Sequence, residues 1–261
     1  MPVVVVHGIP GFVDVHRLLG PGPWTESNGG YTGQLERRLA ADLAARLRGV
    51  VLGGHRLEVE VRPRLKRGLI RAARTEDARR RRQTTPGFHR SGTRLDDEGR
   101  WSLTPEDLAM AMARPYAGLT VLDAMCGAGG NAIAFARCGC SVLAVELDAD
   151  RLENARHNAS VYGVADRIRF IHGDARDEVG RHETDLLFVD PPWGLDHNRE
   201  GLTLDDVSPL GAILDATQQL RRLLKLPPAF PVDELPDHRA EAVFGEAPGD
   251  SARVKFLLLS R

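Results

Sequence analysis

An acid, two prolines and a tryptophan stand together at Asp190-Pro191-Pro192-Trp193, directly after the apolar run Leu186–Val189. The two prolines cannot continue a strand, so they fix a rigid bend. The acid and a carbonyl held by the bend can accept the two hydrogens of an amino group, and the tryptophan can stack on a planar base. This combination suits a site that binds and polarises an amino group attached to a flat ring. The competing interpretation is a proline-stiffened loop with a packed tryptophan.

A glycine-rich turn lies upstream, in the segment DAMCGAGGN at residues 123–131. Its glycines allow the backbone to approach a ligand closely, with a helix N-terminus behind them. The turn lacks the G-x-G-x-x-G spacing of dinucleotide-dependent dehydrogenases. We therefore expect a nucleotide-like cofactor other than a dinucleotide.

Three acids end successive predicted strands: Asp123, Glu146 and Asp174. The carboxyl ends of parallel strands share one edge of a sheet, which is where ligands bind in such folds. Glu146 can accept from both hydroxyls of a ribose, and Asp174 from an adenine amino group. Each acid taken alone could instead cap a helix N-terminus. Together with the glycine turn, the three favour a cofactor that contains adenosine.

The elements that must position these residues alternate between strand and helix from Trp101 onward. Apolar runs predict strands at 119–125, 141–147, 168–174 and 184–190. Helices are predicted at 129–138, 148–164 and 209–224, and the segments EAVFGE and RVKFLLL are predicted to pair as closing strands. Apolar strands separated by helices indicate an α/β fold whose parallel sheet is covered on both faces.

Four segments in order carry a resemblance to a known family: LDDEGRWSLTPEDLAMAMA, DAMCGAGGNAIAFA, ENARHNASVYGVADRIRFIHGDA and DPPWG. The acid four positions before the glycine turn is typical of class I S-adenosylmethionine-dependent methyltransferases. Over about residues 90–261 the chain resembles the trimethylguanosine synthase family of RNA cap guanine-N2 methyltransferases. That resemblance implies a Rossmann-like fold, with a mostly parallel seven-stranded sheet, helices on both faces and a small N-terminal α+β extension.

The resemblance also implies roles for individual residues. Ser102 and Thr104 would lie near the methionine end of S-adenosylmethionine, and Asp123 would hold its amino group. The expected cofactor site comprises Ser102, Thr104, Asp123, Ala124, Cys126, Gly127, Gly129, Asn131, Glu146, Leu147, Asp174, Ala175 and Asp190. The expected catalytic residues are Asp190, Pro191 and Trp193. Pro192, Trp193 and Gly194 would contact the base, and no metal site is expected.

One residue departs from the family pattern, because eukaryotic members carry serine where this chain has Asp190. Aspartate is the commoner choice in amino methyltransferases generally, so the departure weakens the cap as substrate more than it weakens amino methylation. We expect methyl transfer to guanine N2 in RNA or in a guanine nucleotide. The alternatives are adenine N6, a small amine-bearing metabolite, or a catalytically inactive RNA-binding relative. His197 is a candidate proton acceptor after transfer, or a surface histidine.

Composition bounds the setting of this chemistry. The hydrophobic fraction is 42%, and no apolar run approaches the roughly 20 residues of a membrane span. The first residues carry no basic leader. Three cysteines, Cys126, Cys138 and Cys140, make an odd number that fits a reducing compartment. We therefore expect a cytoplasmic protein without a disulfide framework or a membrane partner.

Charge is distributed unevenly along the chain. Residues 1–100 carry 19 basic and 11 acidic side chains, whereas residues 101–261 carry 16 and 25. Between Arg62 and Arg94 there are twelve basic residues against Glu76 and Asp77 alone. A run of this kind is either a solvated face or a platform for RNA phosphates.

The sequence predicts three segments: an N-terminal module at 1–65, a basic helical connector at 66–100 and the methyltransferase domain at 101–261. The module is predicted as strand Val3–Val6, a Gly/Pro-rich loop, a helix at about Gln34–Arg48 and strand Arg56–Arg62. Without a G-x-S-x-G elbow anywhere, it is not part of an α/β-hydrolase. Pro2 as an N-terminal amine would make it similar to the tautomerase family. The alternatives are a degenerate structural module, or a substrate-docking or homodimer-forming extension.

Overall fold

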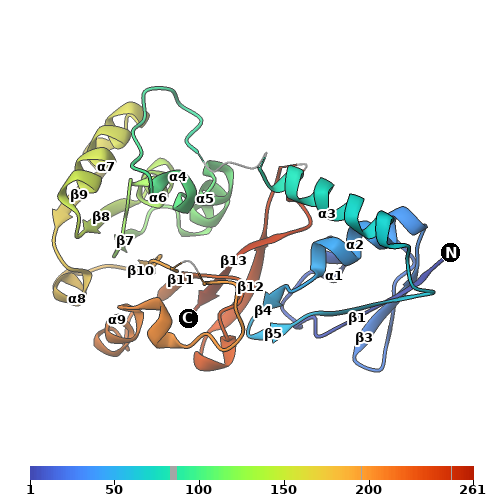
Figure 1. Ribbon diagram of the computed structural model, residues 1–261. Helices are drawn as coiled ribbons and strands as arrows, with labels where there is room; N and C mark the ends of the chain where they lie inside the picture. Colours follow the sequence, from blue (N-terminus) through green and yellow to red (C-terminus); the bar gives the residue numbers. More distant parts are fainter. Residues whose placement is uncertain (83–86, 195, 248) are drawn as a thin grey trace. The chain divides into compact units, whose positions relative to one another are not determined.

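The computed structural model describes residues 1–82, 87–194, 196–247 and 249–261. The chain forms two compact units (Figure 1). The first unit comprises Met1–Thr84, Trp193–Thr203 and Pro227–Leu258, and the second comprises Thr85–Pro192, Leu204–Leu226 and Leu259–Arg261. The units are therefore discontinuous in sequence, whereas the sequence analysis divided the chain into three consecutive segments. Residues 83–86 of the predicted connector lie outside the described residues.

The larger sheet has seven strands in the order β12-β13-β11-β10-β7-β8-β9. The strands are β7 (Thr120–Asp123), β8 (Ser141–Glu146), β9 (Ile168–His172), β10 (Leu186–Val189), β11 (Arg222–Leu226), β12 (Arg239–Phe244) and β13 (Val254–Ser260). The central five, from β11 to β9, are parallel to one another. Every residue of β10 and β11 is buried, as expected for strands covered on both faces. The predicted mostly parallel seven-stranded sheet is confirmed.

Helices cover this sheet within the second unit. They are α4 (Gly99–Ser102), α5 (Glu106–Ala113), α6 (Gly130–Arg137), α7 (Ala149–Tyr162), α8 (Ala175–Glu178) and α9 (Leu210–Ala216). Short 3-10 helices occur at Arg114–Tyr116, Ala165–Arg167 and Leu204–Val207. Figure 1 shows α8 and α9 on the opposite side of β10 and β11 from α5 and α6. Both faces are thus covered, and the ends of β7, β8, β9 and β10 are left to position a site.

The sequence analysis was wrong about the helix predicted at 209–224. The helix α9 ends at Ala216, and residues 222–226 form the buried strand β11. Leucines in this stretch fit a helical period, but burial on both faces favours the extended form. The charged side chains of β11 are accommodated by hydrogen bonds, since Arg222 donates to the carbonyls of Thr217 and Leu214. Lys225, on the same strand, is discussed with the site.

The first unit contains a four-stranded antiparallel sheet in the order β2-β3-β1-β6. Its strands are β1 (Val3–His7), β2 (Thr25–Ser27), β3 (Gly30–Gln34) and β6 (Glu58–Arg62), with a separate ribbon of β4 (Val51–Leu52) and β5 (His55–Arg56). Its helices are α1 (Val15–Leu19), α2 (Arg37–Leu47), α3 (Arg67–Arg82) and a 3-10 turn at Val232–Glu234. The hairpin β2–β3 lies in the Gly/Pro-rich segment that the sequence analysis treated as a loop.

The helices α2 and α3 pack on each other through small side chains. Ala41, Ala45 and Ala73 form a buried cluster, against which Leu65, Leu69 and Ile70 pack. Small residues let the two helices approach closely. The exposed arginines of α3 lie on the face that does not pack on α2.

The module at residues 1–65 is not a simple strand–helix–strand unit. β1 pairs antiparallel with both β3 and β6, whereas a strand–crossover–strand unit gives parallel neighbours. Pro2 is buried, and its carbonyl accepts from the backbone N–H of Leu35 at 3.0 Å. The role of this module remains a prediction. Among the described residues, no helix is both long and apolar enough to cross a membrane.

Candidate active site

Four predicted site acids follow the ends of four parallel strands of the second unit. Asp123 ends β7, Glu146 ends β8, and Asp174 and Asp190 follow β9 and β10. The register pairs Asp123 with Phe188 on β10, and Glu146 with His172 on β9. All four acids therefore occupy the carboxyl edge of one sheet, as the sequence predicted.

The glycine turn is held between two strands by its own backbone. Ala124 N–H donates to the carbonyl of Phe188 on β10 at 3.0 Å, and Cys126 N–H donates to Val145 on β8 at 2.8 Å. The turn ends at Gly129, whose φ of 89° lies in the left-handed region that favours glycine. A Cβ at Gly129 would lie 3.1 Å from the Cβ of Ala155. Both facts explain why glycine stands there.

Glu146 is buried and fixes the turn. Its Oε2 accepts from Gly127 N–H and its Oε1 from Asp148 N–H, each at 2.9 Å. Each carboxylate oxygen retains a second lone pair for a ligand hydroxyl. The next residue, Leu147, is 68% exposed, which is unusual for a large apolar side chain beside a buried acid. Its exposed surface is consistent with the predicted place of the cofactor, although its role there stays a prediction.

Asp123 is the most unusual acid of the site. It is completely buried, and neither carboxylate oxygen has a hydrogen-bond partner within the described residues. Burial raises its pKa well above the ordinary value, and the nearby Asp190 adds to this effect; the backbone N–H of Met125, which is near but outside hydrogen-bond geometry, opposes it. An ionised carboxylate in such surroundings is costly unless a cation pairs with it.

Among the predicted cofactor-site residues that the structure describes, two further buried acceptors lack partners: Thr104 Oγ1 and Asn131 Oδ1. Thr104 precedes α5, and Asn131 lies in the first turn of α6, directly after the glycine turn. With Asp123, these atoms form a set of acceptors that needs donors. The ammonium of S-adenosylmethionine is a donor and a cation, so the residues present fit the methionine end of that cofactor.

Asp174 differs from Asp123 because the chain itself satisfies it. It is the N-cap of α8, accepting from the backbone N–H of Arg176 at 2.9 Å, and it also pairs with the Arg176 guanidinium. These contacts hold the Asp174 pKa below its ordinary value, with the Arg176 side chain as the main cause. The capping interpretation thus describes this acid, and Ala175 is buried behind it. Binding of adenine by Asp174 stays a prediction and would have to compete with Arg176.

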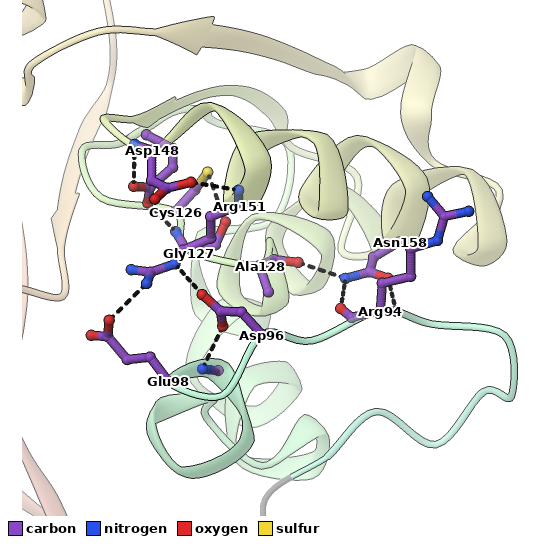
Figure 2. Close-up of polar contacts among 11 residues, drawn as sticks. Arg94, Asp96, Glu98, Cys126, Gly127, Ala128, Asp148, Arg151 and Asn158 are labelled. Carbon is purple, nitrogen blue, oxygen red and sulfur yellow. Dashed lines mark hydrogen bonds and ion pairs between the residues drawn. The ribbon is translucent and has the colours of Figure 1, made fainter.

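A strap at residues 88–104 carries Ser102 and Thr104, and α7 holds it in place. Figure 2 shows Asn158 of α7 between Arg94 and Ala128. Asn158 is completely buried; its Oδ1 accepts from Arg94 N–H at 2.7 Å, and its Nδ2 donates to the carbonyls of Arg94 and Ala128 at 2.8 and 2.9 Å. One side chain therefore joins the strap to the glycine turn. Sequence reasoning missed it, although an asparagine inside a helix that otherwise favours alanine is a usable signal.

The same strap is anchored a second time by Arg151 of α7. Arg151 pairs with Asp96 at 2.9 Å and with Glu98 at 2.7 Å (Figure 2). Asp96 also accepts from the backbone N–H of Gly99. These contacts lead the strap into α4 and towards Thr104. Ser102, at the end of α4, is exposed, whereas Thr104 is buried.

Asp190 receives two hydrogen bonds on one oxygen. Asn131 Nδ2 donates to Oδ2 at 3.0 Å, and Lys225 Nζ on β11 donates to the same atom at 2.7 Å. The Lys225 and Asp190 side chains are 4% and 15% exposed. Burial raises the Asp190 pKa, while Lys225 and Asn131 oppose the rise. The sequence analysis missed Lys225 because it placed the preceding residues, 209–224, in a helix and predicted no strand here, yet a single lysine in the apolar run LLKL was the available signal.

The tryptophan of the motif belongs to the first unit, as part of Trp193–Thr203. Trp193 is half-buried, and its ring centroid lies 5.8 Å from that of His197. His197 Nδ1 lies 2.9 Å from the carbonyl of Gly194, which requires the proton on Nδ1. Pro191 is buried and Pro192 is exposed. The contact of Trp193 and Gly194 with a base stays a prediction.

Cys126 contributes packing to the site rather than a reactive thiolate. It is buried in the glycine turn, and burial, followed by the charge of Asp123, raises its pKa well above the ordinary value. A thiol of this kind stays protonated near neutral pH. In the described ranges of the chain, no group of histidine, cysteine and acidic side chains has the arrangement of a metal site.

Comparison with known proteins agrees with this geometry. A family profile described as RNA cap guanine-N2 methyltransferase matches residues 119–205. Trimethylguanosine synthase of Schizosaccharomyces pombe is 35% identical over 113 residues, which is 40% of this chain and 47% of that protein. The Saccharomyces cerevisiae trimethylguanosine synthase is 31% identical over 148 residues, 51% of this chain and 45% of that protein. The chain thus spans about half the length of these two relatives.

A solved structure supports the same fold. The crystal structure of a SAM-dependent methyltransferase from Agrobacterium tumefaciens aligns with a TM-score of 0.50 and 18% identity, over 67% of this chain and 69% of that one. The sheet order, the glycine turn between β7 and α6, the acids at the strand ends and these matches all agree. The chain therefore has the Rossmann-like fold of class I S-adenosylmethionine-dependent methyltransferases, and its residues 119–205 are similar to the RNA cap guanine-N2 methyltransferase family.

Proposed function

We propose that this protein methylates an exocyclic amino group of a nucleobase, with guanine N2 in RNA or in a guanine nucleotide as the preferred target. The observation that carries the proposal is Asp190, held through Oδ2 by Asn131 and Lys225 at the carboxyl edge of the sheet. No donor within the described residues is bonded to its Oδ1. An acid held in this way offers one directed acceptor for an N–H group.

Residues of the second unit would hold the cofactor. Asp123 would pair with its ammonium, Thr104 and Asn131 would accept from neighbouring donors, and Glu146 would bind the ribose with its remaining lone pairs. When bound, S-adenosylmethionine supplies a methyl group that is electrophilic because it is attached to a sulfonium. The buried set of acceptors gives this chain a reason to bind a cationic ligand there.

On the substrate side, Asp190 performs two tasks. A base amino group is a poor nucleophile because its lone pair is delocalised into the ring, and a hydrogen bond to Oδ1 makes the nitrogen more electron-rich. The nitrogen becomes positively charged as it takes the methyl group, so a carboxylate beside it stabilises the transition state. One proton then leaves the nitrogen, and Oδ1 is placed to take it and pass it to water.

The arginines of α3 support RNA as the substrate class. Arg67, Arg71 and Arg74 are exposed and follow one another at helical spacing, so they share one face of α3. None of the three has an ion pair within the described residues, whereas Arg79 and Arg80 are paired with Glu76. Unpaired guanidinium groups on one face are suited to phosphates. This support is independent of the site, because α3 belongs to the first unit.

Adenine N6 is the second candidate, and Asp190 itself favours it. The residue is an aspartate, the commoner acceptor in amino methyltransferases, rather than the serine of the eukaryotic relatives. Homodimer formation through residues 1–65 and the cytoplasmic location stay proposals without support from the described contacts.

The deciding experiment is a transfer assay with labelled cofactor, followed by mass spectrometry of the digested nucleosides. Capped RNA, uncapped RNA, DNA and free guanine nucleotides are the substrates to compare. We expect N2-methylguanosine from an RNA or nucleotide substrate, and N6-methyladenosine would shift the proposal to the second candidate. Absence of label from every pool would refute amino methylation. Trp193→Ala should raise the substrate KM far more than the cofactor Kd if Trp193 stacks on the base.

A further inference from the structure

Lys225 is a buried cation on the strand next to the one that delivers Asp190. Lysine is seldom buried unless it is paired, and here its Nζ lies 2.7 Å from Asp190 Oδ2. The positions beside Lys225 in β11 are leucines, so an apolar side chain would also fit this buried strand. Its presence therefore calls for an explanation in terms of Asp190.

The surroundings explain why Asp190 needs a cation. Asp123 on β7 is a second buried carboxylate close enough to interact with Asp190 electrostatically, and the charge of Glu146 on β8 also acts on Asp123. Lys225 is the cation that counters these charges, and its effect reaches Asp123 as well. Asn131, from α6, donates to the same oxygen but carries no charge. Without Lys225, two neighbouring buried acids would favour protonation of one of them.

We propose that Lys225 is a positioning residue that keeps Asp190 ionised and holds its Oδ2, so that Oδ1 alone faces the amino group to be methylated. The inference deepens the proposed function, and the identity of the bound amino group rests on that function. Lys225 itself does not touch the substrate. Its consequence for specificity is that Asp190 offers an acceptor only, which selects an N–H donor and disfavours a ring carbonyl.

The ionisation half of the proposal can be tested without turnover. In Lys225→Met, Asp190 stays buried but loses its cation, so its pKa in the folded protein rises further above the unfolded value. An acid whose folded pKa is raised loses stability as the pH increases from its unfolded pKa of about 4 towards the folded pKa. We therefore expect the melting temperature of K225M to fall relative to wild type as the pH rises. The double variant K225M/D190N should lack this pH dependence.

Arg222→Met is the matched control, because Arg222 is equally buried on β11 but donates only to the carbonyls of Thr217 and Leu214. It should lose stability by an amount that does not depend on Asp190 or on pH in this range. Equal pH dependence in K225M and R222M would overturn the assignment of Lys225 to Asp190.

The positioning half is tested by kinetics on whichever base amino group proves to be the substrate. K225M should lower kcat about 100-fold and move the acidic limb of the pH–rate profile upward by about 1–3 units. The cofactor Kd should change little, and K225R should restore the limb because it keeps the charge. When Asp190 is already replaced in D190N, adding K225M should lower kcat further by less than about 3-fold. The positioning role would be refuted if K225M left the acidic limb of the pH–rate profile unshifted. It would also be refuted if K225M lowered kcat about 100-fold in the D190N background, even if methylation is demonstrated. If no base is methylated but the pH-dependent stability difference is found, the proposed function fails while the Lys225–Asp190 coupling stands.

Discussion

Asp123 and Asp174 are the same residue type at the same edge of one sheet, yet their surroundings oppose each other. Asp123 is completely buried without a hydrogen-bond partner within the described residues, and its pKa is raised. Asp174 caps α8 and pairs with Arg176, and its pKa is lowered. If the cofactor binds as proposed, its methionine end would meet an acid without a hydrogen-bond partner among the described residues, whereas its adenine end would meet an acid that Arg176 already pairs. We therefore expect the binding free energy to come mainly from the proposed methionine end.

The largest effect is expected from Asp123→Asn. A hydrogen bond to a charged group contributes about 1.5–3 kcal/mol, so losing the carboxylate should weaken cofactor binding roughly 100-fold. The free protein should instead become more stable, because a buried unpaired charge is removed. Calorimetric titration and thermal unfolding measure the two effects. Asp174→Asn is the matched control, and an equal loss of affinity there would contradict the comparison.

The same contrast predicts opposite pH dependences. The folded pKa of Asp123 is raised, so the free protein should lose stability as the pH rises from the unfolded pKa towards the folded one. A bound ammonium favours the ionised form, so cofactor binding should strengthen over that range and release a proton. Titrations in buffers of different ionisation enthalpy would detect the proton. Asp123→Asn should abolish its release, and persistence of the release would assign it to another group.

Glu146→Gln should have an intermediate effect. The carboxylate accepts from the backbone N–H groups of Gly127 and Asp148, and the neutral amide can keep only one of these bonds on its oxygen. We expect the cofactor Kd to rise about tenfold, since a charged acceptor is worth roughly 1 kcal/mol more than a neutral one. Hydrogen exchange at Gly127 should accelerate in the variant. An unchanged exchange rate would show that Glu146 does not hold the turn.

The smallest effect is expected at the adenine end. Asp174→Asn should alter the cofactor Kd by less than about threefold, because Arg176 already occupies the carboxylate. Arg176→Ala sharpens the test, since it frees Asp174 while leaving the N-cap in place. If Asp174 binds adenine, that variant should bind the cofactor more tightly than wild type. No change in either variant would mean that the adenine is held by other contacts, such as the exposed side chain of Leu147.

Much of the sheet was predictable because the apolar runs are separated by clear helical segments. The strands β7 to β10 and the helices α6 and α7 lie where the sequence placed them, and so the acids at their ends were found. β11 was missed because its leucines continue the period of α9, and local pattern cannot distinguish a buried helix from a buried strand. Missing β11 also meant missing Lys225. The hairpin β2–β3 was missed because its strands are short and rich in glycine and polar residues.

The sequence by itself determined the fold class, the glycine turn and which acids end the strands, because these depend on local periodicity and on the rule that parallel strands share an edge. The tertiary structure decided which buried acid is paired, because Lys225 lies 35 residues from Asp190 along the chain. Arg176 lies only two residues from Asp174, so that pairing is local. Whether a carboxylate is satisfied depends on burial and on neighbours brought together by folding. For this reason Asp123, which the sequence could not distinguish from Asp174, is the acid left for a cation.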